Sequence, residues 1–187
     1  MEIIGIIAEY NPFHLGHLYQ LQEARRLFSS DSAVVVVMSG CFTQRGEPAL
    51  TDKWSRAKMA LSCGVDLVLE LPFVYACASA ERFAEGGVRV LQATGLKSTL
   101  LFGSECGDLP LLQKTADRLA FETPVFQDLL HHYLNQGLSF PKARSQAFRD
   151  CWPDDEGAEL LHSPNNILAI EYLKAIRKIP CCRLTPC

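Results

Sequence analysis

The sequence predicts an α/β fold built on a parallel sheet, and two observations favour it. Short strands alternate with helical segments through the first half of the chain. The strands are apolar nearly throughout, as in "AVVVVM" at 33–38, which is typical of strands covered on both faces. Such strands, joined by helices, favour right-handed crossovers within one parallel sheet.

Four strands and three helices are expected before residue 104. The strands are 3–8, 33–38, "DLVLELP" ending at Pro72, and "STLLFG". The helices are 15–28, a segment capped by Thr51 and Asp52 that runs to Cys63, and 79–93. Gly86 and Gly87 weaken the last of these patterns, because glycine disfavours helix interiors.

The pattern changes after residue 103. Segments 109–122, 125–136 and 141–148 have helical spacing with no strand between them, so we predict a helical insertion at about 108–160. A further helix begins with Ser163 as its N-cap and Pro164 at its first position. The segment "CCRLTPC" could begin a fifth strand. We expect all of 1–187 to form one domain.

Composition limits the possible partners. A chain of 187 residues with 18 basic and 21 acidic side chains has a net charge of −3 and no global basic excess. A nucleic-acid partner therefore requires a local basic patch or another part of the protein. The start has no cationic segment, and its apolar run is too short to span a bilayer, so we expect a cytoplasmic chain with no membrane partner.

The eight cysteines do not indicate a metal site or a disulfide framework. None has CxxC spacing, and no histidine follows at the spacing of a zinc finger. Without a secretory signal, disulfides are not expected either. We interpret these cysteines as reduced and mostly buried small apolar residues.

Four polar loops follow the four predicted strands. They are "EYNPFHLGH", "SGCFTQRGEPA", "ELPF" and "GSE". Ligands of open α/β sheets bind outside the carboxyl ends of the strands, so we expect these loops to converge on one crevice. Within them, the polar residues Gln44, Arg45 and Glu47 favour a role in substrate recognition over a plain solvated loop. Glu70 is expected either to face the site or to be paired.

His14 and His17 allow three interpretations. They could be structural, they could bind a metal, or they could donate to phosphate oxygens at the start of a helix. No carboxylate follows at suitable spacing, which disfavours the metal. A helix N-terminus favours anions, and Gly16 lets a nucleotide approach the backbone, so the sequence favours the phosphate interpretation.

"HLGH" after a first strand resembles the HxGH motif of the HIGH-type nucleotidylyltransferase superfamily. Together, "GIIAEYNPFHLGH", "SGCFTQRGEPA", "DKWSRAKMALSCGVDLVLELP", "FGSE" and "SPNNILAIEYLKA" closely resemble the bacterial tRNA(Met) cytidine acetate ligase family. The resemblance implies a Rossmann-like parallel sheet with a helical insertion after the fourth strand. It also implies an enzyme that activates acetate with ATP and acetylates N4 of the wobble cytidine of elongator tRNA(Met).

In such a reaction His14 and His17 are expected to be catalytic, because they could stabilise the α-phosphate and the leaving pyrophosphate, and Mg²⁺ is expected to accompany the ATP. The resemblance implies an arginine in the strand after the last helix, for which Arg183 is a poor candidate, and a C-terminal region that this chain lacks. The positions implied for ATP are Ile7, Ala8, Glu9, Tyr10, Asn11, Pro12, Phe13, His14, Leu15, Gly16, His17, Leu18, Tyr19, Gln20, Gly103, Asn165 and Asn166.

Other charged residues have less distinctive patterns. Lys53 and Arg56 could contact phosphate or RNA, or they could lie on a solvated helix face. Ser104 and Glu105 suggest either a nucleotide contact or a helix cap. The acidic run 154–156 predicts a solvated turn.

Two other functions remain open from the sequence. An HxGH nucleotidylyltransferase could act on a small phosphorylated metabolite, or the chain could be a non-catalytic ATP-binding fragment. Acetate-dependent pyrophosphate exchange would distinguish the acetate ligase from both of these alternatives. The oligomeric state has no signal in the sequence.

Overall fold

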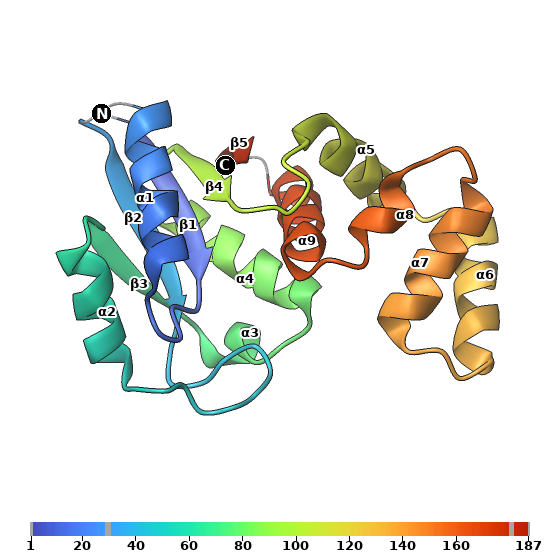
Figure 1. The fold of residues 1–187 in the computed structure, drawn as a ribbon, viewed down its shortest axis with the longest axis horizontal. Helices are drawn as coiled ribbons and strands as arrows, with labels where there is room; N and C mark the ends of the chain where they lie inside the picture. The colour runs from blue at the N-terminus through green and yellow to red at the C-terminus, as the bar shows by residue number, and fades with distance from the viewer. Residues whose placement is uncertain (1, 29–30, 180–181, 187) are drawn as a thin grey trace.

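Five parallel strands form the centre of the molecule (Figure 1). The structure is a computed structural model that describes residues 2–28 and 31–179, and the backbone of 182–186. The strands are β1 (Ile3–Ala8), β2 (Ala33–Ser39), β3 (Leu67–Leu71), β4 (Ser98–Phe102) and β5 (Cys182–Pro186). Their order is β3-β2-β1-β4-β5.

Helices connect and cover the strands. They are α1 (Leu15–Leu27), α2 (Lys53–Ser62), α3 (Phe73–Ala76), α4 (Ala80–Ala93), α5 (Leu109–Ala120), α6 (Pro124–Asn135), α7 (Phe140–Cys151), α8 (Gly157–Leu160) and α9 (Pro164–Lys178). The predicted α/β fold, its parallel sheet and the helical insertion after the fourth strand are confirmed. The short helices α3 and α8 were not predicted, because a single turn has no apolar period.

The sheet separates two apolar layers. Alternate residues of β1 point to opposite faces, as a strand requires. Ile4 and Ile6 pack with Leu21 of α1 and Ala60 of α2 on one face. The other side of the sheet packs in a larger core that includes α4, α5, α7 and α9. The buried middle of the sheet therefore fixes the positions of the loops at its carboxyl edge.

β3 departs from the predicted pattern of burial. It lies at the end of the sheet, and the helices cover it incompletely: Leu67 is 44% exposed. Glu70 is also exposed and forms an ion pair with Lys53, with 2.6 Å between Nζ and Oε2. The prediction that this strand is covered on both faces is wrong, whereas the pairing considered for Glu70 is present.

The two glycines that weakened the prediction of α4 have a packing role. A Cβ on Gly87 would lie 2.5 Å from Ile7 Cδ1 of β1, and one on Gly86 would lie 2.3 Å from the Tyr75 ring. Both positions are too close for a larger residue. The glycines thus allow α4 to approach the sheet and α3 closely.

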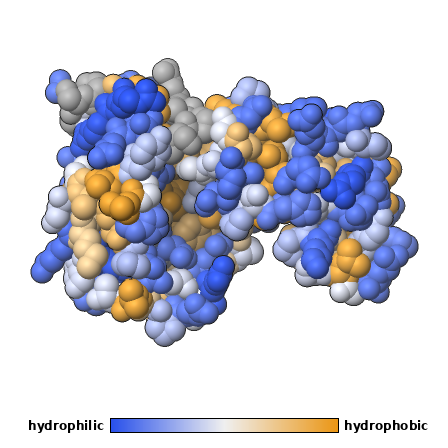
Figure 2. Space-filling model, in the orientation of Figure 1, coloured by the Kyte–Doolittle hydropathy of each residue, from blue (hydrophilic) through white to orange (hydrophobic). Residues whose placement is uncertain are grey.

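The helical insertion forms a lobe beside the sheet. In Figure 1, α6 and α7 lie side by side, farthest from the strands, and Figure 2 shows a notch between this lobe and the sheet-bearing body. That the lobe and the sheet-bearing body form one domain stays a prediction. None of the helices in the described part of the chain has both the length and the hydropathy needed to cross a membrane.

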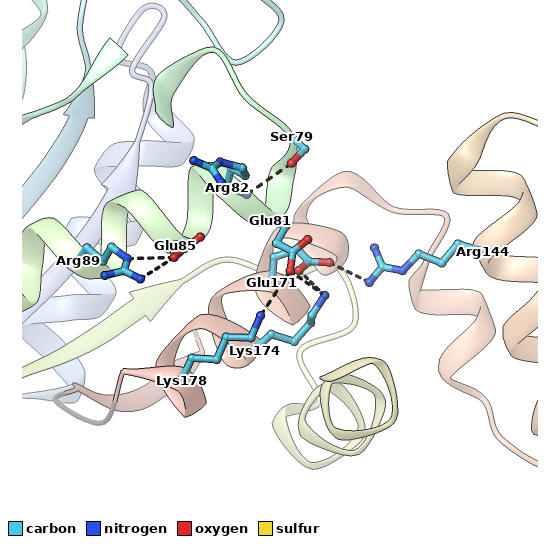
Figure 3. Close-up of polar contacts among 9 residues, drawn as sticks. All are labelled: Ser79, Glu81, Arg82, Glu85, Arg89, Arg144, Glu171, Lys174 and Lys178. Atoms are coloured by element: carbon cyan, nitrogen blue, oxygen red, sulfur yellow. Dashed lines mark hydrogen bonds and ion pairs between the residues drawn. The ribbon is translucent and has the colours of Figure 1, made fainter. Parts of the chain in front are cut away.

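Buried carboxylates fasten the lobe. Figure 3 shows Glu171 of α9 in contact with Arg144 of α7 and with Lys174. The Glu171 carboxylate oxygens lie 2.8 Å from Arg144 Nη2 and 2.8 Å from Lys174 Nζ. Asp155 is buried and paired with Lys114 and Arg118 of α5. The predicted solvated turn at 154–156 is therefore wrong for Asp155, because two cations from another helix compensate its burial.

Candidate functional site

A cavity of about 710 Å³ opens at the carboxyl ends of β1 and β4, which is within the range of small-molecule sites. Figure 2 shows a recess with hydrophobic walls between α1 and the centre of the molecule. The residues that line the cavity are Ile7, Ala8, Glu9, Tyr10, Asn11, Pro12, His14, Gly16, His17, Tyr19, Gln20, Gln44, Arg45, Phe83, Phe102, Gly103, Ser104, Asn165, Leu168 and Tyr172.

His14 and His17 cap helix α1 with their own rings. His14 is the N-cap, and its Nδ1 accepts the Gly16 N–H at 3.1 Å. His17 Nδ1 accepts the His14 N–H at 3.2 Å, and the two rings stack with 3.7 Å between centroids. Since both Nδ1 atoms are acceptors, each neutral ring carries its proton on Nε2, by inference from this bonding pattern. The two Nε2–H groups remain available as donors to a ligand.

The environment of His17 keeps its ring neutral. Burial, together with the smaller effect of the neighbouring His14, lowers the pKa of His17 to about 4. Tyr10 and Phe13 supply much of that apolar environment, with ring centroids 4.7 and 5.5 Å from the His17 ring. At neutral pH, His17 therefore acts through a ring N–H dipole rather than through a full positive charge.

Tyr10 holds the turn between β1 and α1. Its φ of 48° lies in the left-handed region, which is uncommon for a residue with a bulky side chain. The side chain is buried, and its ring packs edge to face with Phe13, with 4.9 Å between the ring centroids. Burial also raises the pKa of Tyr10 above its usual range, so the hydroxyl stays protonated. Packing of this ring compensates the backbone strain and positions His17.

Arg56 is a buried clamp beneath the site. It is 0% exposed, and its guanidinium donates to the backbone carbonyls of Glu9, Gly40 and Thr51. These carbonyls belong to the loops after β1 and β2. Burial lowers the pKa of Arg56, although nearby acidic groups oppose that effect. Both interpretations offered from the sequence, a ligand contact and a solvated helix face, are wrong for this residue.

The loop after β2 forms one wall of the cavity. Two side chains from the loop after β1 hold it: the Glu9 carboxylate accepts the Gln44 N–H, and Asn11 Oδ1 accepts the Leu50 N–H at 2.6 Å. This fastening brings Gln44 and Arg45 to the cavity. Among the described lining residues, Arg45 is the single lysine or arginine, so it supplies the positive charge of this wall.

A reciprocal lock joins the loop after β4 to the start of α9. The Glu105 carboxylate accepts the N–H groups of Asn165 and Asn166, at 3.0 and 2.7 Å. Asn166 Oδ1 accepts the N–H groups of Glu105 and Cys106, at 2.9 and 3.2 Å. The carboxylate thus occupies the helix N-terminus that an anion would otherwise favour. Glu105 caps α9, and Ser104 lines the cavity.

The structure brings together most of the predicted site residues. Thirteen of the seventeen line the cavity, and those that do not are Phe13, Leu15, Leu18 and Asn166. Leu15 is 82% exposed, whereas the Asn166 side chain is engaged in the lock. Of the four loops, "ELPF" does not reach the cavity, since β3 lies at the far edge of the sheet. The side chain of Arg183 lies outside the described residues.

Apolar lining residues were missed by the sequence reasoning. Phe83, Phe102, Leu168 and Tyr172 form an apolar wall from α4, β4 and α9. Phe102 and Tyr172 lie in the same core cluster, with ring centroids 6.0 Å apart. In the sequence, these residues belong to the regular apolar patterns of their strand and helices. The one available signal was the position of Phe102 at the carboxyl end of its strand.

These features define a class of nucleotide-binding protein with histidines at the start of the first helix. The HIGH Nucleotidyl Transferase family model matches residues 1–181, and the chain belongs to this family. It is 49% identical over 186 residues to the tRNA(Met) cytidine acetate ligase of Clostridium perfringens, covering 96% of this chain and 46% of that relative. It is 52% identical over 189 residues to the protein of the same name from Syntrophomonas wolfei, covering 99% and 45%.

A solved structure is also similar. The crystal structure of Thermotoga maritima TmcAL bound with alpha-thio ATP matches this chain with a TM-score of 0.92 and 44% sequence identity. The match covers 100% of this chain and 46% of the Thermotoga maritima chain. The chain therefore spans about half the length of the relatives that it matches.

Proposed function

We propose that the cavity binds ATP and that the chain supports ATP-dependent activation of acetate for acetylation of N4 of the wobble cytidine in elongator tRNA(Met). The observation that carries this proposal is the pair of stacked histidines, whose Nδ1 atoms accept backbone N–H groups, beside a cavity of nucleotide size. The curated relatives, which are named tRNA(Met) cytidine acetate ligase, and the structure with alpha-thio ATP support the choice of substrates.

The first step joins acetate to AMP. A carboxylate oxygen of acetate attacks the α-phosphorus of ATP, and the bond from that phosphorus to the bridging oxygen breaks, so pyrophosphate leaves. Negative charge develops on the phosphate oxygens, where His14 and His17 donate through Nε2–H. Positioning and charge stabilisation suffice for such a transfer. Gln44 and Arg45 are placed to hold the acetate carboxylate beside the α-phosphate.

The second step transfers the acetyl group. The N4 amine of cytidine attacks the acetyl carbonyl, the bond to the AMP oxygen breaks, and the amine loses a proton. The apolar wall of Phe83, Phe102 and Leu168 is suited to the adenine ring. Among the positions implied for ATP, Asn165 lines the cavity, and we propose that it holds a polar group of the nucleotide.

Mg²⁺ is proposed to arrive with ATP and to neutralise phosphate charge. Among the described residues, no group of three histidine, cysteine or acidic side chains could hold a metal ion. Among the lining residues that the structure describes, Glu9 is the single carboxylate, and it already accepts the Gln44 N–H. This donor set fits an ion held mainly by phosphate oxygens and water.

Exchange of labelled pyrophosphate into ATP tests the proposal. We expect exchange that depends on added acetate and does not require tRNA. Exchange that requires a phosphorylated metabolite instead would indicate the second nucleotidylyltransferase function. ATP binding without exchange under either condition would indicate a non-catalytic ATP-binding fragment, and both outcomes contradict the proposal.

A further inference from the structure

Three aromatic side chains are exposed on the far side of the loop after β2. Phe42, Trp54 and Phe73 are 37%, 70% and 61% exposed, and we call them the aromatic surface. The Phe42 and Phe73 rings meet edge to face, with 5.5 Å between centroids. Trp54 does not touch these rings, but its neighbour Lys53 links it to the Glu70 carboxylate: the Lys53 Nζ lies 5.4 Å from the indole centroid and binds Glu70. Exposed aromatic groups of this kind mark interaction sites.

A second cavity lies within the aromatic surface. It measures about 170 Å³ and is lined by Gly40, Cys41, Phe42, Glu70, Leu71, Phe73 and Ala76. This volume is below the range of sites for complete small-molecule ligands, so it suits a single flat ring. The cavity offers both an aromatic face and a carboxylate: Glu70 is half-exposed, and only its Oε2 is paired with Lys53.

Two cations lie beside the aromatic surface. Lys53 lies on one side, where it is paired with Glu70. On the other side, the Arg82 guanidinium stacks 5.7 Å from the ring of Tyr75, two residues after Phe73. Among the described residues, Arg82 takes part in no ion pair. Aromatic rings interleaved with cations are the pattern of sites for single-stranded nucleic acid.

One loop separates the aromatic surface from the main cavity. Gly40, Cys41 and Phe42 line the small cavity, whereas Gln44 and Arg45 line the large one. The buried Thr43 lies between them. A single strand that crosses this loop can therefore place one base in the small cavity and a neighbouring nucleotide at the mouth of the large one.

We propose that the aromatic surface binds an unpaired RNA base next to the nucleotide that is modified. This base stacks on Phe73 in the small cavity, and the next base along the strand stacks on Trp54 outside it. An exocyclic amine of the first base donates to Glu70, which favours a base with such an amine, for example cytosine, over uracil. Lys53 and Arg82 contact the flanking phosphates. The identity of the strand as RNA rests on the proposed function, whereas the base-binding site rests on the aromatic surface and its cavity.

Fluorescence anisotropy with two labelled pentaribonucleotides, oligocytidylate and oligouridylate, tests the proposal on the full chain. We expect Phe73→Ala and Trp54→Ala each to weaken oligocytidylate binding by about 5- to 100-fold, the usual contribution of one stacked base. Phe73→Tyr keeps the ring and should retain binding. Phe121→Ala removes an aromatic side chain that is 76% exposed between α5 and α6, and it serves as the matched control, with unchanged affinity.

Glu70→Gln tests the choice of base. A glutamine amide can donate to uracil as well as accept from cytosine, so we expect the preference for oligocytidylate to disappear. Wild-type affinity in both alanine variants, or equal losses in Phe121→Ala, would overturn the proposal. Thermal melting of each variant shows whether a loss of binding reflects unfolding, and Phe73→Tyr remains informative if Phe73→Ala does not fold.

Acetate-dependent pyrophosphate exchange by the wild-type chain is measured without RNA in parallel. Exchange without oligonucleotide binding overturns this inference alone. Oligonucleotide binding that depends on Phe73, without exchange, overturns the proposed function alone.

Discussion

Glu105 and Asn166 each bind the backbone of the segment that carries the other. The Glu105 carboxylate accepts two N–H groups at the start of α9, and the Asn166 amide oxygen accepts two N–H groups of the loop after β4. Neither side chain lines the cavity, whereas their neighbours Ser104 and Asn165 do. The pair therefore sets the width of the cavity between β4 and α9 without being placed to contact a ligand.

Removing this lock is expected to weaken nucleotide binding. Glu105→Ala removes two hydrogen bonds from the start of α9, and loss of a cap typically costs about 0.5–2 kcal/mol of stability. ATP affinity, measured by calorimetry, should fall because Gly103 and Asn165 lose their fixed separation. Asp108→Ala is the matched control, since Asp108 caps α5 through Leu111 N–H at 3.0 Å and does not line the cavity. A similar loss of affinity in both variants would contradict a positioning role.

His14 combines two roles that substitution can separate. His14→Ala removes both the cap of α1 and the Nε2–H donor, whereas His14→Asn keeps a good N-cap and removes the donor. If the donor acts on developing phosphate charge, both variants should lose about 10²–10³ in the rate of adenylate formation. Only the alanine variant should also lose thermal stability. A wild-type rate in His14→Asn would show that capping is the only role of His14.

His17 should stay neutral down to acidic pH. Its pKa is lowered to about 4 in the folded chain, below the value of about 6.5 for an unfolded chain. The unfolded state therefore binds a proton first, so His17 contributes stability above pH 6.5 that is lost as the pH falls towards 4. The His17 ring signals in NMR should not shift between pH 8 and pH 5.5. Urea midpoints of wild type should fall more than those of His17→Gln between pH 7 and pH 5.

Arg56 should be among the most sensitive positions for folding. Arg56→Met fills similar space but leaves the carbonyls of Glu9, Gly40 and Thr51 without their donor. An unsatisfied buried acceptor costs about 1–3 kcal/mol, so we expect a loss of at least about 3 kcal/mol in urea unfolding. Arg26→Met is the control, because Arg26 pairs with Glu23 on the exposed surface of α1. Such pairs contribute about 0–1 kcal/mol, and equal losses in the two variants would contradict the clamp.

The sequence predicted features that depend on local patterns. Strands such as β2 are recognisable because an apolar β-branched run fits a strand covered on both faces. The histidines were found because two residues and a glycine at a helix start form a local motif. The order of the strands could not be predicted from such local patterns. Because β3 lies at the edge of the sheet, the loop "ELPF" is separated from the other three loops.

Burial of charge could not be predicted, because it depends on distant partners. Arg56 lies in a helix with the pattern of a surface segment, but three carbonyls from two loops meet it. Asp155 lies in an acidic run, but Lys114 and Arg118 reach it from α5. The sequence did not single out Tyr172 and Phe83, because a cavity wall and a core have the same apolar composition.

The last prediction concerns tRNA binding by this chain alone. Its net charge is −3, and the cations beside the aromatic surface are few, so few phosphates can be neutralised. Each neutralised phosphate of a single strand adds about 0.7 to the slope of log affinity against log salt concentration. We therefore expect weak tRNA binding with a shallow salt dependence.

The comparison is with the Clostridium perfringens relative, of which this chain matches 46%. We expect that relative to bind tRNA more tightly and with a steeper salt slope, because its further residues offer additional surface for phosphate contacts. ATP affinity should differ less, since the proposed ATP cavity lies within the matched part. Filter retention of labelled tRNA at two salt concentrations measures both slopes. Tight and strongly salt-dependent binding by the 187-residue chain would place the main RNA site in the nucleotidyl transferase domain itself.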